Sequence, residues 1–450
     1  MTPYADLPLP PGNLGLPLLG ETLAFLRDPL AFAEERQARY GRVYKTGLFG
    51  RPTVVFTAPE GIRFLLANEY RYFSVSWPAT TARLLGPGSI SVAEGDLHKR
   101  QRRLFQRAFD RELVSSYVPQ MESIAKKHAR RWQMTGELAL CPAISEFTFD
   151  LACRLIIGMQ DNECSEAEVR ELSRRFALCT AGLFALPIPL PLAKYGRALR
   201  QRQLLLARIR RIVVARQDAT DKSLAERRDA LSVMLQACRA EGQTADLDGL
   251  QDQVLTLLFA GHDTSSCALA NFFLLVLQHP AVLSRLRAEQ DEIGREVPLR
   301  AAMLSQMPYL DQVIREVLRF IPPVGGGFRK IIAPCEFAGY QLPMGWNAFY
   351  QIAGPHRDSA IFKDPERFDP DRFAPERAED RGQRFSYIPF GGGPRVCLGM
   401  EFARLEMAVM GALMIREFEW QLLPGQDLRI APIPLPRPRS GLLVRVSHRL

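Results

Sequence analysis

The sequence predicts a mainly α-helical protein with small antiparallel β-sheets at its periphery. Between about residues 58 and 320, apolar residues recur at helical spacing through segments rich in Arg, Leu, Ala and Glu, a pattern typical of amphipathic helices. By contrast, residues 324–375 are rich in Gly, Pro and aromatic residues and indicate short strands and turns. The clearest helical segments are 98–109, 112–132, 164–180, 197–217 and 226–240.

Two shorter segments are predicted to be non-helical. Residues 43–57 contain two apolar runs around a Gly-Arg-Pro sequence and predict a β-hairpin. Residues 181–193 are apolar but contain Pro187, Pro189 and Pro191, which a helix interior does not tolerate. The second segment is therefore expected to be an apolar loop between two helices, of the kind that caps a pocket or contacts a membrane peripherally.

Two helices are predicted to dominate the second half of the chain. The first runs from about Leu250 to Gln278 and ends before a His-Pro pair. Its second half is apolar on nearly every face apart from Asn271, which indicates a central, buried helix. The other runs from about Tyr309 to Phe320 and stops before a Pro-Pro pair. A further helix at 398–416 and a terminal hairpin in the last 30 residues complete the prediction.

Composition and charge narrow the class of protein. The 450 residues are 47% hydrophobic and 24% charged, and they show no internal repeat or linker, so we expect one globular domain over 1–450 with a Pro-rich segment at about 1–20. The net charge of +9 permits an acidic protein partner or a membrane surface. The basic residues are spread evenly, and no nucleic-acid partner is expected.

The sequence also carries expectations about location. No basic residue precedes Arg27, prolines interrupt the early apolar residues, and no apolar run approaches the ~18 residues of a membrane span. We therefore expect neither a secretory signal nor a transmembrane anchor. Eight cysteines without a Cys-x-x-Cys pair indicate reduced thiols and a cytoplasmic protein.

The most informative stretch is Phe-Gly-Gly-Gly-Pro-Arg-Val-Cys-Leu-Gly, residues 390–399. Its three glycines are not a phosphate-binding loop, because Gly-Lys-Ser/Thr does not follow them. The stretch fits a metal-ligand loop, in which Cys397 precedes a helix whose positive end stabilises a thiolate. Such a thiolate can ligate haem iron, and its electron donation favours O–O bond cleavage.

The residues around Cys397 also fit a haem-ligand loop. Gly393 and Gly399 allow the backbone to approach a flat macrocycle, Arg395 offers a guanidinium to a haem propionate, and Phe390 would shield the sulfur from water. The alternative is a tight glycine turn with an inert cysteine. Because all five fixed positions of Phe-x-x-Gly-x-Arg-x-Cys-x-Gly are present, the haem-ligand interpretation is favoured.

On these residues the sequence resembles the cytochrome P-450 haem-thiolate monooxygenases, and the resemblance extends over the whole chain. It implies the cytochrome P-450 fold, with haem b enclosed between the central long helix and the cysteine-ligand loop. It also implies a monooxygenase that activates dioxygen. Because one domain accounts for all 450 residues, no fused reductase is expected. Electrons would come from an external ferredoxin or flavodoxin, and the protein is expected to be a monomer.

The central helix carries Ala-Gly-His-Asp-Thr-Ser at 260–265, resembling the family's oxygen-activating motif. Gly261 would thin the helix where it crosses the haem, which offsets the cost of about 1 kcal/mol for Gly in place of Ala. Asp263 and Thr264 are the candidate catalytic residues: the acid supplies a proton and the hydroxyl holds a water or bonds back into the helix. His262 is expected to be structural, since Cys397 already provides the iron ligand.

A second motif resembles the family's buried ion-pair set. Glu316 and Arg319 lie three residues apart on one helix face. The third member is expected in Pro-Asp-Arg-Phe, at Arg372, although an upstream near-copy places Arg367 in a similar context. The set is expected to be structural and to hold the region that carries the cysteine loop.

Basic residues are expected at the haem edge and at a docking face. His98 and Arg102, four residues apart, resemble the family's Trp/His-x-x-x-Arg propionate pair, with His in place of the commoner Trp, and Arg329 is a further propionate candidate. The remaining charges of the early helix would form a docking face for an acidic redox protein, and the alternative is an ordinary solvated basic helix. They are Lys99, Arg100, Arg103 and Arg107.

On the substrate side, several stretches look most similar to the cyanobacterial retinoid-hydroxylating group and, more distantly, to the animal retinoic-acid hydroxylases. The wholly apolar loop 181–193 agrees in type, because such a lining suits an elongated apolar molecule. The resemblance implies a pocket lined by Trp77, Phe184, Leu186, Pro187, Ala260, Val324, Gly325 and Gly326.

The predicted activity is therefore hydroxylation of an elongated apolar substrate, with a retinoid such as retinoic acid as the first choice. A fatty acid or another terpenoid is the alternative substrate. A haem-thiolate peroxygenase or isomerase is a rival enzyme, which the Asp263-Thr264 pair argues against. A non-catalytic haem sensor or lipid carrier is the rival from another class, and no segment of the chain resembles an output domain.

Overall fold

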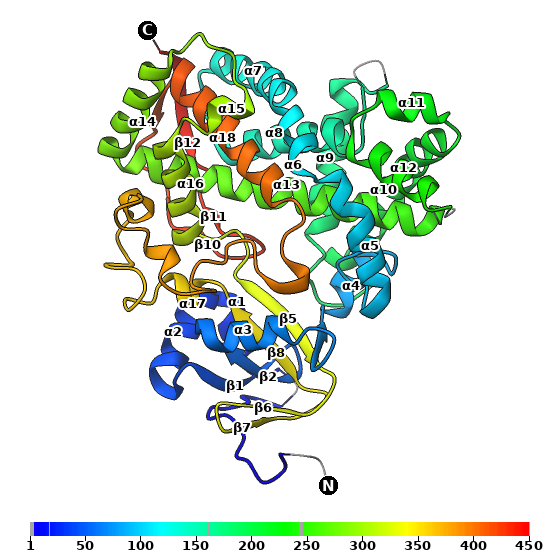
Figure 1. Cartoon of the computed structure of the whole chain (residues 1–450), viewed down its shortest axis with the longest axis vertical. Helices are drawn as coiled ribbons and strands as arrows, with labels where there is room; N and C mark the ends of the chain where they lie inside the picture. Colours follow the sequence, from blue (N-terminus) through cyan, green and yellow to red (C-terminus); the bar gives the residue numbers. More distant parts are fainter. Residues whose placement is uncertain (1–3, 18, 161–162, 243–245, 450) are drawn as a thin grey trace. The chain divides into compact units, whose positions relative to one another are not determined.

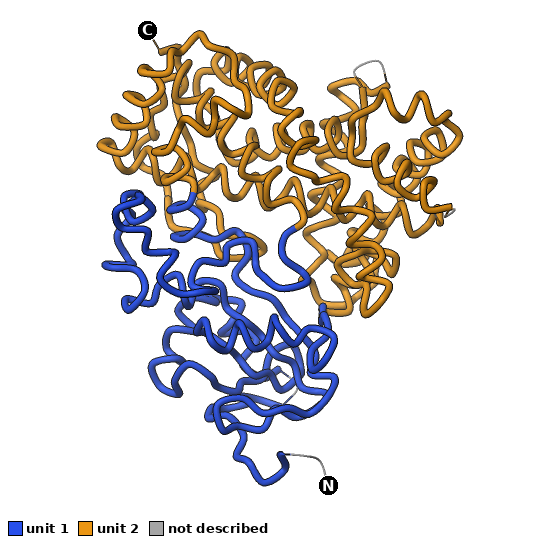
Figure 2. The backbone as a smooth tube through the Cα atoms, in the orientation of Figure 1, with its two compact units in different colours: residues 1–77, 315–397 blue, residues 78–314, 398–450 orange. Residues whose placement is uncertain are grey.

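A computed structural model of the chain describes residues 4–17, 19–160, 163–242 and 246–449. Helices make up most of it, and the strands form small sheets (Figure 1). The chain divides into two units, one formed by residues 1–77 and 315–397 and the other by residues 78–314 and 398–450 (Figure 2). The predicted mainly helical fold with small sheets is thus confirmed.

The first unit is built around a five-stranded sheet of order β1-β2-β8-β5-β3. The antiparallel pair β1 and β2 continues through a parallel pairing of β2 with β8, and β5 pairs antiparallel with both β8 and β3. Fully buried apolar residues such as Val54, Phe56, Phe73 and Ile331 form its core. The strands are β1 (Val43–Leu48), β2 (Arg51–Phe56), β3 (Phe73–Val75), β5 (Gly326–Ile331), β6 (Cys335–Phe337), β7 (Tyr340–Leu342) and β8 (Asn347–Gln351).

Short helices accompany this sheet. The α-helices are α1 (Thr22–Arg27), α2 (Pro29–Tyr40), α3 (Pro59–Ala67) and α17 (Ala353–His356), and the 3-10 helices are η1 (Pro370–Phe373), η2 (Glu379–Arg381) and η3 (Gly393–Arg395). The predicted hairpin at 43–57 is present as β1 and β2, but its turn is one step earlier than expected. Phe49 and Gly50 make the turn with φ of 53° and 74°, and Arg51 and Pro52 already belong to β2.

The second unit contains the long helices. Its α-helices are α4 (Ala79–Leu85), α5 (Gly95–Ala108), α6 (Arg111–Ser116), α7 (Val118–Thr135), α8 (Leu140–Leu155), α9 (Glu166–Thr180), α10 (Lys194–Gln217), α11 (Asp221–Glu226), α12 (Ala230–Ala240), α13 (Leu247–Gln278), α14 (Pro280–Ile293), α15 (Ala301–Leu304) and α18 (Met400–Glu417). The division of the chain crosses α16 (Pro308–Phe320) between Ile314 and Arg315.

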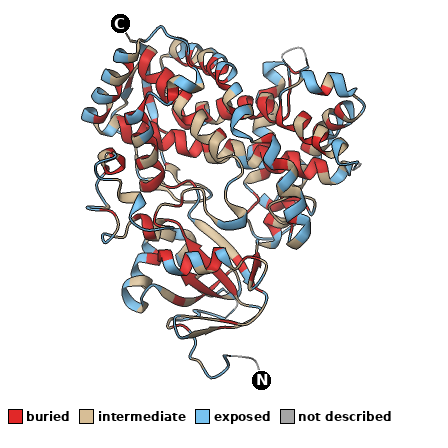
Figure 3. Cartoon of the chain, viewed as in Figure 1, coloured by how far each residue is buried: buried red, intermediate tan, exposed pale blue. Residues whose placement is uncertain are grey.

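Helix α13 is the centre of this unit. It packs against α8, α10 and α18, and every residue from Ser265 to Val276 is buried (Figure 3). Both predicted long helices end at the predicted residues, Gln278 and Phe320, because proline follows each of them. Residues 112–132, predicted as one helix, form two instead, α6 and α7, which meet at Tyr117 beside Pro119.

The C-terminal strands form more than a simple hairpin. Strand β12 (Leu443–His448) pairs antiparallel with β9 (Phe418–Leu422) and, on its other edge, with β4 (Glu137–Ala139). Between β9 and β12 lies a two-stranded ribbon of β10 (Ile430–Ala431) and β11 (Arg437–Pro438). The predicted terminal hairpin is therefore present as β9 and β12, joined by a longer connection than the sequence indicated.

No single helix among the described residues is long and apolar enough to cross a membrane. Helices α13 and α14 satisfy the length and composition criteria only as a pair, and they are bent by 105° at their junction.

Candidate active site

The cysteine loop of the first unit has a defined backbone. After the 3-10 turn η3, the Cys397 N–H donates to the Phe390 carbonyl at 2.9 Å, which closes the loop, and α18 begins three residues later. Six of the other cysteines are buried and Cys238 is half-buried, whereas Cys397 is exposed. The cysteine that the motif singles out is thus the exposed one.

Two glycines shape the loop in different ways. Gly393 has φ of 67°, and a Cβ atom there would lie 2.7 Å from the Leu66 carbonyl oxygen, so the position requires glycine. At Gly399 a Cβ atom would meet no protein atom within 4 Å, which leaves the backbone open to approach by a ligand.

A carboxylate that the sequence did not single out holds two of the predicted propionate residues. The Nε atoms of Arg329 and Arg395 each lie 2.6 Å from a different oxygen of Glu69, whose side chain is 1% exposed. Arg329 lies on β5 and Arg395 in η3, so Glu69 joins the sheet to the cysteine loop within the first unit. No local motif indicates this role for Glu69.

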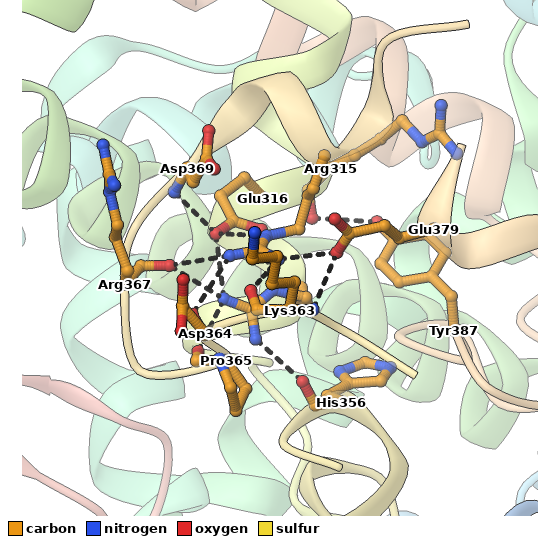
Figure 4. A network of polar contacts seen from close by, with 12 residues as sticks. Arg315, Glu316, His356, Lys363, Asp364, Pro365, Arg367, Asp369, Glu379 and Tyr387 are labelled. Atoms are coloured by element: carbon orange, nitrogen blue, oxygen red, sulfur yellow. Dashed lines mark hydrogen bonds and ion pairs between the residues drawn. The ribbon is translucent and has the colours of Figure 1, made fainter. Parts of the chain in front are cut away.

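The predicted ion-pair set forms in the same unit, within the network of polar contacts around Glu316 in Figure 4. All three side chains are fully buried. Arg319 donates to both Glu316 oxygens, at 2.7 and 2.8 Å. The Arg372 Nε donates to Glu316 Oε1 at 3.1 Å, and the Asp369 N–H donates to the same oxygen. Arg367, the alternative in the sequence, joins the network through its backbone: its carbonyl accepts from Arg372 at 3.0 Å and from Arg319 at 3.4 Å.

Further hydrogen bonds connect this set to the segment that precedes the cysteine. Arg319 Nη1 donates to the His356 carbonyl at 2.7 Å, and the Ile388 N–H donates to His356 Nε2 at 2.9 Å. Burial lowers the pKa of His356 to about 3, with the nearby Arg319 charge acting in the same direction, so the imidazole is neutral and accepts this bond. The backbone two residues before Phe390 is thereby fixed.

In the second unit, one turn of α13 is partly uncovered within the stretch from Leu250 to Val276, which is otherwise buried. Ala260 is exposed, and Gly261, Asp263 and Thr264 are half-buried. The Thr264 hydroxyl bonds back to the Ala260 carbonyl, one of the two roles predicted for it. A Cβ atom at Gly261 would lie 2.9 Å from Ile156 Cδ1, so this glycine also has a packing role that the sequence did not predict.

The residues beside the acid are polar. His262 is buried, its Nδ1 is 2.8 Å from the Thr148 hydroxyl, and burial lowers its pKa to about 4. This environment is that of a structural histidine. Asp263 lies next to Arg437 of β11, a residue that sequence reasoning missed.

The early basic helix α5 carries the remaining predicted cofactor residues. His98 is buried and Arg102 is half-buried, one helical turn apart. Of the predicted docking charges, Lys99 pairs with Asp96 at 3.0 Å and Arg107 lies 3.6 Å from Glu241, while Arg100 and Arg103 are exposed.

None of the predicted pocket residues is buried. In the second unit, Phe184, Leu186, Pro187 and Ala260 are exposed or half-buried, and the loop that carries the first three is anchored where the Thr80 and Thr81 hydroxyls donate to the Leu183 carbonyl. In the first unit, Trp77, Val324 and Gly325 are exposed or half-buried, and Gly326 is half-buried. Each unit therefore has exposed apolar side chains at the positions predicted to line the pocket.

This combination, an accessible cysteine on a fixed glycine loop in a helical fold with an acid–alcohol pair on its central helix, defines a haem-thiolate protein. The family model described as Cytochrome P-450 matches residues 10–444, and the chain belongs to that family. It is a cytochrome P-450 monooxygenase, and the family implies a haem, a substrate, dioxygen and a redox partner.

Individual relatives resemble the chain over nearly its full length. A putative cytochrome P-450 120 of Synechocystis is 42% identical over 98% of this chain and 97% of its own length. Cytochrome P-450 26B1 of Xenopus tropicalis and that of Homo sapiens are each 34% identical over 98% of this chain and 86% of their own length. A solved structure, retinoic acid bound cyanobacterial CYP120A1, superposes with a TM-score of 0.91 at 41% identity and covers 99% of this chain and 100% of its own.

The residues present fit the haem that the family implies. Cys397 offers an accessible sulfur, and no Cβ stands in the way at Gly399. The one interruption in the burial of α13 between Leu250 and Val276 falls within residues 259–264, on the predicted oxygen-activating motif. In each unit, therefore, the residues that the sequence assigns to the haem include positions that are not buried.

Proposed function

We propose that the protein hydroxylates an elongated apolar substrate, with a retinoid such as retinoic acid as the preferred one, using electrons from a separate ferredoxin or flavodoxin. The observation that carries the substrate class is the full-length similarity, at 41% identity, to a cytochrome P-450 whose structure holds retinoic acid. The apolar side chains that each unit leaves exposed support an apolar ligand. A fatty acid or another terpenoid is the alternative.

Four residues of the cysteine loop are proposed to hold the cofactor. Cys397 would ligate the iron of haem b as a thiolate, Phe390 would shield the sulfur, and Gly393 and Gly399 would admit the ring. When bound, the haem supplies the reduction and cleavage of dioxygen and the transfer of one oxygen atom to the substrate.

Four basic residues are proposed for the propionates. Arg329 and Arg395 already share the buried carboxylate of Glu69, so their guanidiniums are fixed by the protein before any propionate is present. His98 and Arg102, one turn apart on α5, are proposed for the same task. Glu316, Arg319 and Arg372 are proposed to act structurally, by holding the backbone that leads to the cysteine loop.

Asp263 and Thr264 are proposed to move protons. The overall reaction is R–H + O₂ + 2 e⁻ + 2 H⁺ → R–OH + H₂O, so two protons must reach the reaction centre in each cycle. The Asp263 carboxyl would release a proton toward the Thr264 hydroxyl and regain one from solvent. Thr264, which now donates to the Ala260 carbonyl, would exchange this bond for one to a water molecule.

The carbon-monoxide difference spectrum of the reduced protein tests the ligand. We expect the red-shifted Soret band of a thiolate-ligated haem, and we expect Cys397→Ala to lose it while Cys238→Ala, the matched control at a half-buried cysteine, keeps it. A thiolate band that survives in Cys397→Ala would refute the ligand assignment.

Substrate titrations test the second half of the proposal. Retinoic acid, retinal and long-chain fatty acids are added to the holoprotein, and the Soret shift that follows displacement of the iron-bound water is recorded. We expect retinoic acid to bind more tightly than fatty acids of similar length and to be hydroxylated with a ferredoxin system. A shift with fatty acids but not with retinoids would replace the substrate and leave the monooxygenase activity in place.

A single domain over 1–450, a monomeric state, a cytoplasmic location and peripheral contact of loop 181–193 with a membrane remain predictions. The exposure of Leu186, Leu190 and Leu192, followed by Lys194 at the start of α10, agrees with the last of these.

A further inference from the structure

An arginine from the far end of the chain contacts the acid of α13. Arg437 Nη2 donates to the Ser266 hydroxyl at 2.6 Å and to the Asp263 carbonyl at 3.1 Å, and it lies 3.4 Å from Asp263 Oδ1. The Arg437 side chain is 28% exposed and that of Asp263 is 17% exposed. The three residues belong to the second unit, and Arg437 and Asp263 are 174 positions apart in the sequence.

The segment that carries Arg437 is fastened to the same helix. The preceding carbonyl, that of Pro436, accepts from Asn271 Nδ2 at 2.8 Å and lies 3.1 Å from Cys267 Sγ. The β10–β11 pairing joins Arg437 to Ala431. Because the backbone is held on α13 independently of the guanidinium, the position of Arg437 does not depend on its contact with Asp263.

The contact with the carboxylate is the one that can be given up. A guanidinium Nη carries two hydrogens, and Arg437 Nη2 faces three acceptors, of which Asp263 Oδ1 is the most distant. Ser266 and the Asp263 carbonyl can satisfy both hydrogens when the carboxylate turns away. Rotation of the carboxylate away from Arg437 would therefore leave both hydrogens of this Nη2 atom bonded.

A partly buried guanidinium at this position is unfavourable unless it interacts with an anion. Arg437 Nε is buried without a hydrogen-bond partner among the described residues, which is unfavourable for a charged group. On the other side of the acid, His262 Nε2 is 3.7 Å from Asp263 Oδ1, and burial lowers the His262 pKa to about 4. Because that imidazole is neutral near pH 7, Arg437 is the cation beside Asp263.

We propose that Arg437 is a positioning residue that holds the Asp263 carboxylate between proton transfers and thereby sets how much of the reduced dioxygen ends in product. This inference rests on the proposed role of Asp263. When protons arrive on time, one oxygen atom enters the substrate and the other leaves as water. When proton delivery through Asp263 is too slow, the two electrons leave with two protons as hydrogen peroxide, O₂ + 2 e⁻ + 2 H⁺ → H₂O₂.

The experiment compares Arg437→Gln and Arg437→Lys with Arg439→Gln, an exposed arginine two residues along the same segment. Each holoprotein is first shown to give the thiolate carbon-monoxide band. The readout is peroxide formed per dioxygen consumed. We expect the Gln variant to raise it at least threefold, the Lys variant to restore part of the loss because the charge returns, and Arg439→Gln to match the unchanged chain.

A double-mutant cycle distinguishes positioning from simple packing. In an Asp263→Asn background, Arg437→Gln should add nothing further to the peroxide ratio. The change in urea midpoint of the double variant should also differ from the sum of the changes in the two single variants. If the peroxide ratio of Arg437→Gln equals that of the unchanged chain, or if it rises as much in the Asp263→Asn background, the proposal is wrong and Arg437 only fastens the C-terminal segment.

These outcomes are separate from those of the proposed function. The peroxide ratio needs no particular substrate, so it can be measured with whichever ligand shifts the Soret band. If retinoids neither bind nor react, the substrate proposal fails while the comparison of Arg437 variants still decides the role of the arginine.

Discussion

At the scale of single residues, Glu406 on α18 is a buried acid whose carboxyl group is not paired with a cation among the described residues. Its side chain is 1% exposed, and neither carboxyl oxygen has a hydrogen bond of ordinary geometry to a described residue. Burial raises its pKa to about 8, although the nearby Ser265 hydroxyl acts in the opposite direction. At neutral pH the carboxyl group is therefore mostly protonated, whereas the same group in the unfolded chain is ionised.

This difference predicts a pH dependence of stability that belongs to one residue. Between about pH 4.5 and 8 the folded state keeps a proton on Glu406 that the unfolded state has lost, so the contribution of this residue to the free energy of unfolding falls as the pH rises, by up to about 1.4 kcal/mol per pH unit. We expect Glu406→Gln, which cannot ionise, to remove this decline. The measurement is the urea midpoint from pH 5 to pH 8.

The control is Glu401→Gln, a half-buried glutamate on the same helix. Its pH profile should parallel that of the unchanged chain. A constant difference between Glu406→Gln and the unchanged chain at every pH would show that Glu406 is ionised in the folded protein and would contradict the argument.

At the scale of elements, the ion-pair set joins α16 to the irregular segment before the cysteine loop. One Glu316 carboxylate accepts from Arg319, Arg372 and the Asp369 N–H, all inside the first unit. Arg372 continues to Glu379 at 2.7 Å and to the Lys363 carbonyl at 2.8 Å. Residues 357–399 contain only short 3-10 turns, so these bonds substitute for regular secondary structure.

Removal of one charge should therefore destabilise the segment strongly. We expect Glu316→Gln to lower the free energy of unfolding by about 3–5 kcal/mol, because the buried Arg319 loses its anion and the buried Arg372 keeps only Glu379. Arg357→Gln, which breaks the exposed pair with Glu366, is the matched control and should cost no more than about 1 kcal/mol. Chemical denaturation measures both values, and equal costs would show that the buried set contributes no more than a surface pair.

The elements differ in how far the sequence predicts them. Proline and glycine signals are local, so the ends of α13 and α16 and the presence of the β1–β2 hairpin follow from short windows. The cysteine loop and the members of the ion-pair set follow from spacing. The partners that complete these sites do not, because Glu69 lies 260 and 326 residues from its two arginines and Arg437 lies 174 from Asp263. Such pairs are fixed by topology, which short windows do not contain.

At the scale of the whole molecule, the net charge of +9 bears on the redox partner that the family requires. Helix α5 presents Arg100 and Arg103 as exposed charges, while Lys99 and Arg107 are partly neutralised by Asp96 and Glu241. An acidic ferredoxin or flavodoxin would be steered by the first two more than by the others, because a charge already paired contributes less to the field that a partner meets.

Charge reversal tests this docking face. We expect Arg100→Glu/Arg103→Glu to lower the second-order rate of reduction by an acidic ferredoxin at least tenfold at low ionic strength, and Arg197→Glu/Arg200→Glu, two exposed arginines of α10, to lower it much less. Both rates, and that of the unchanged chain, should converge as salt is added, since charges more than about 10 Å apart are screened near 0.1 M. Stopped-flow reduction measures the rates. If the two double variants slow the reaction equally, the attraction belongs to the overall charge of the protein and α5 is an ordinary solvated helix.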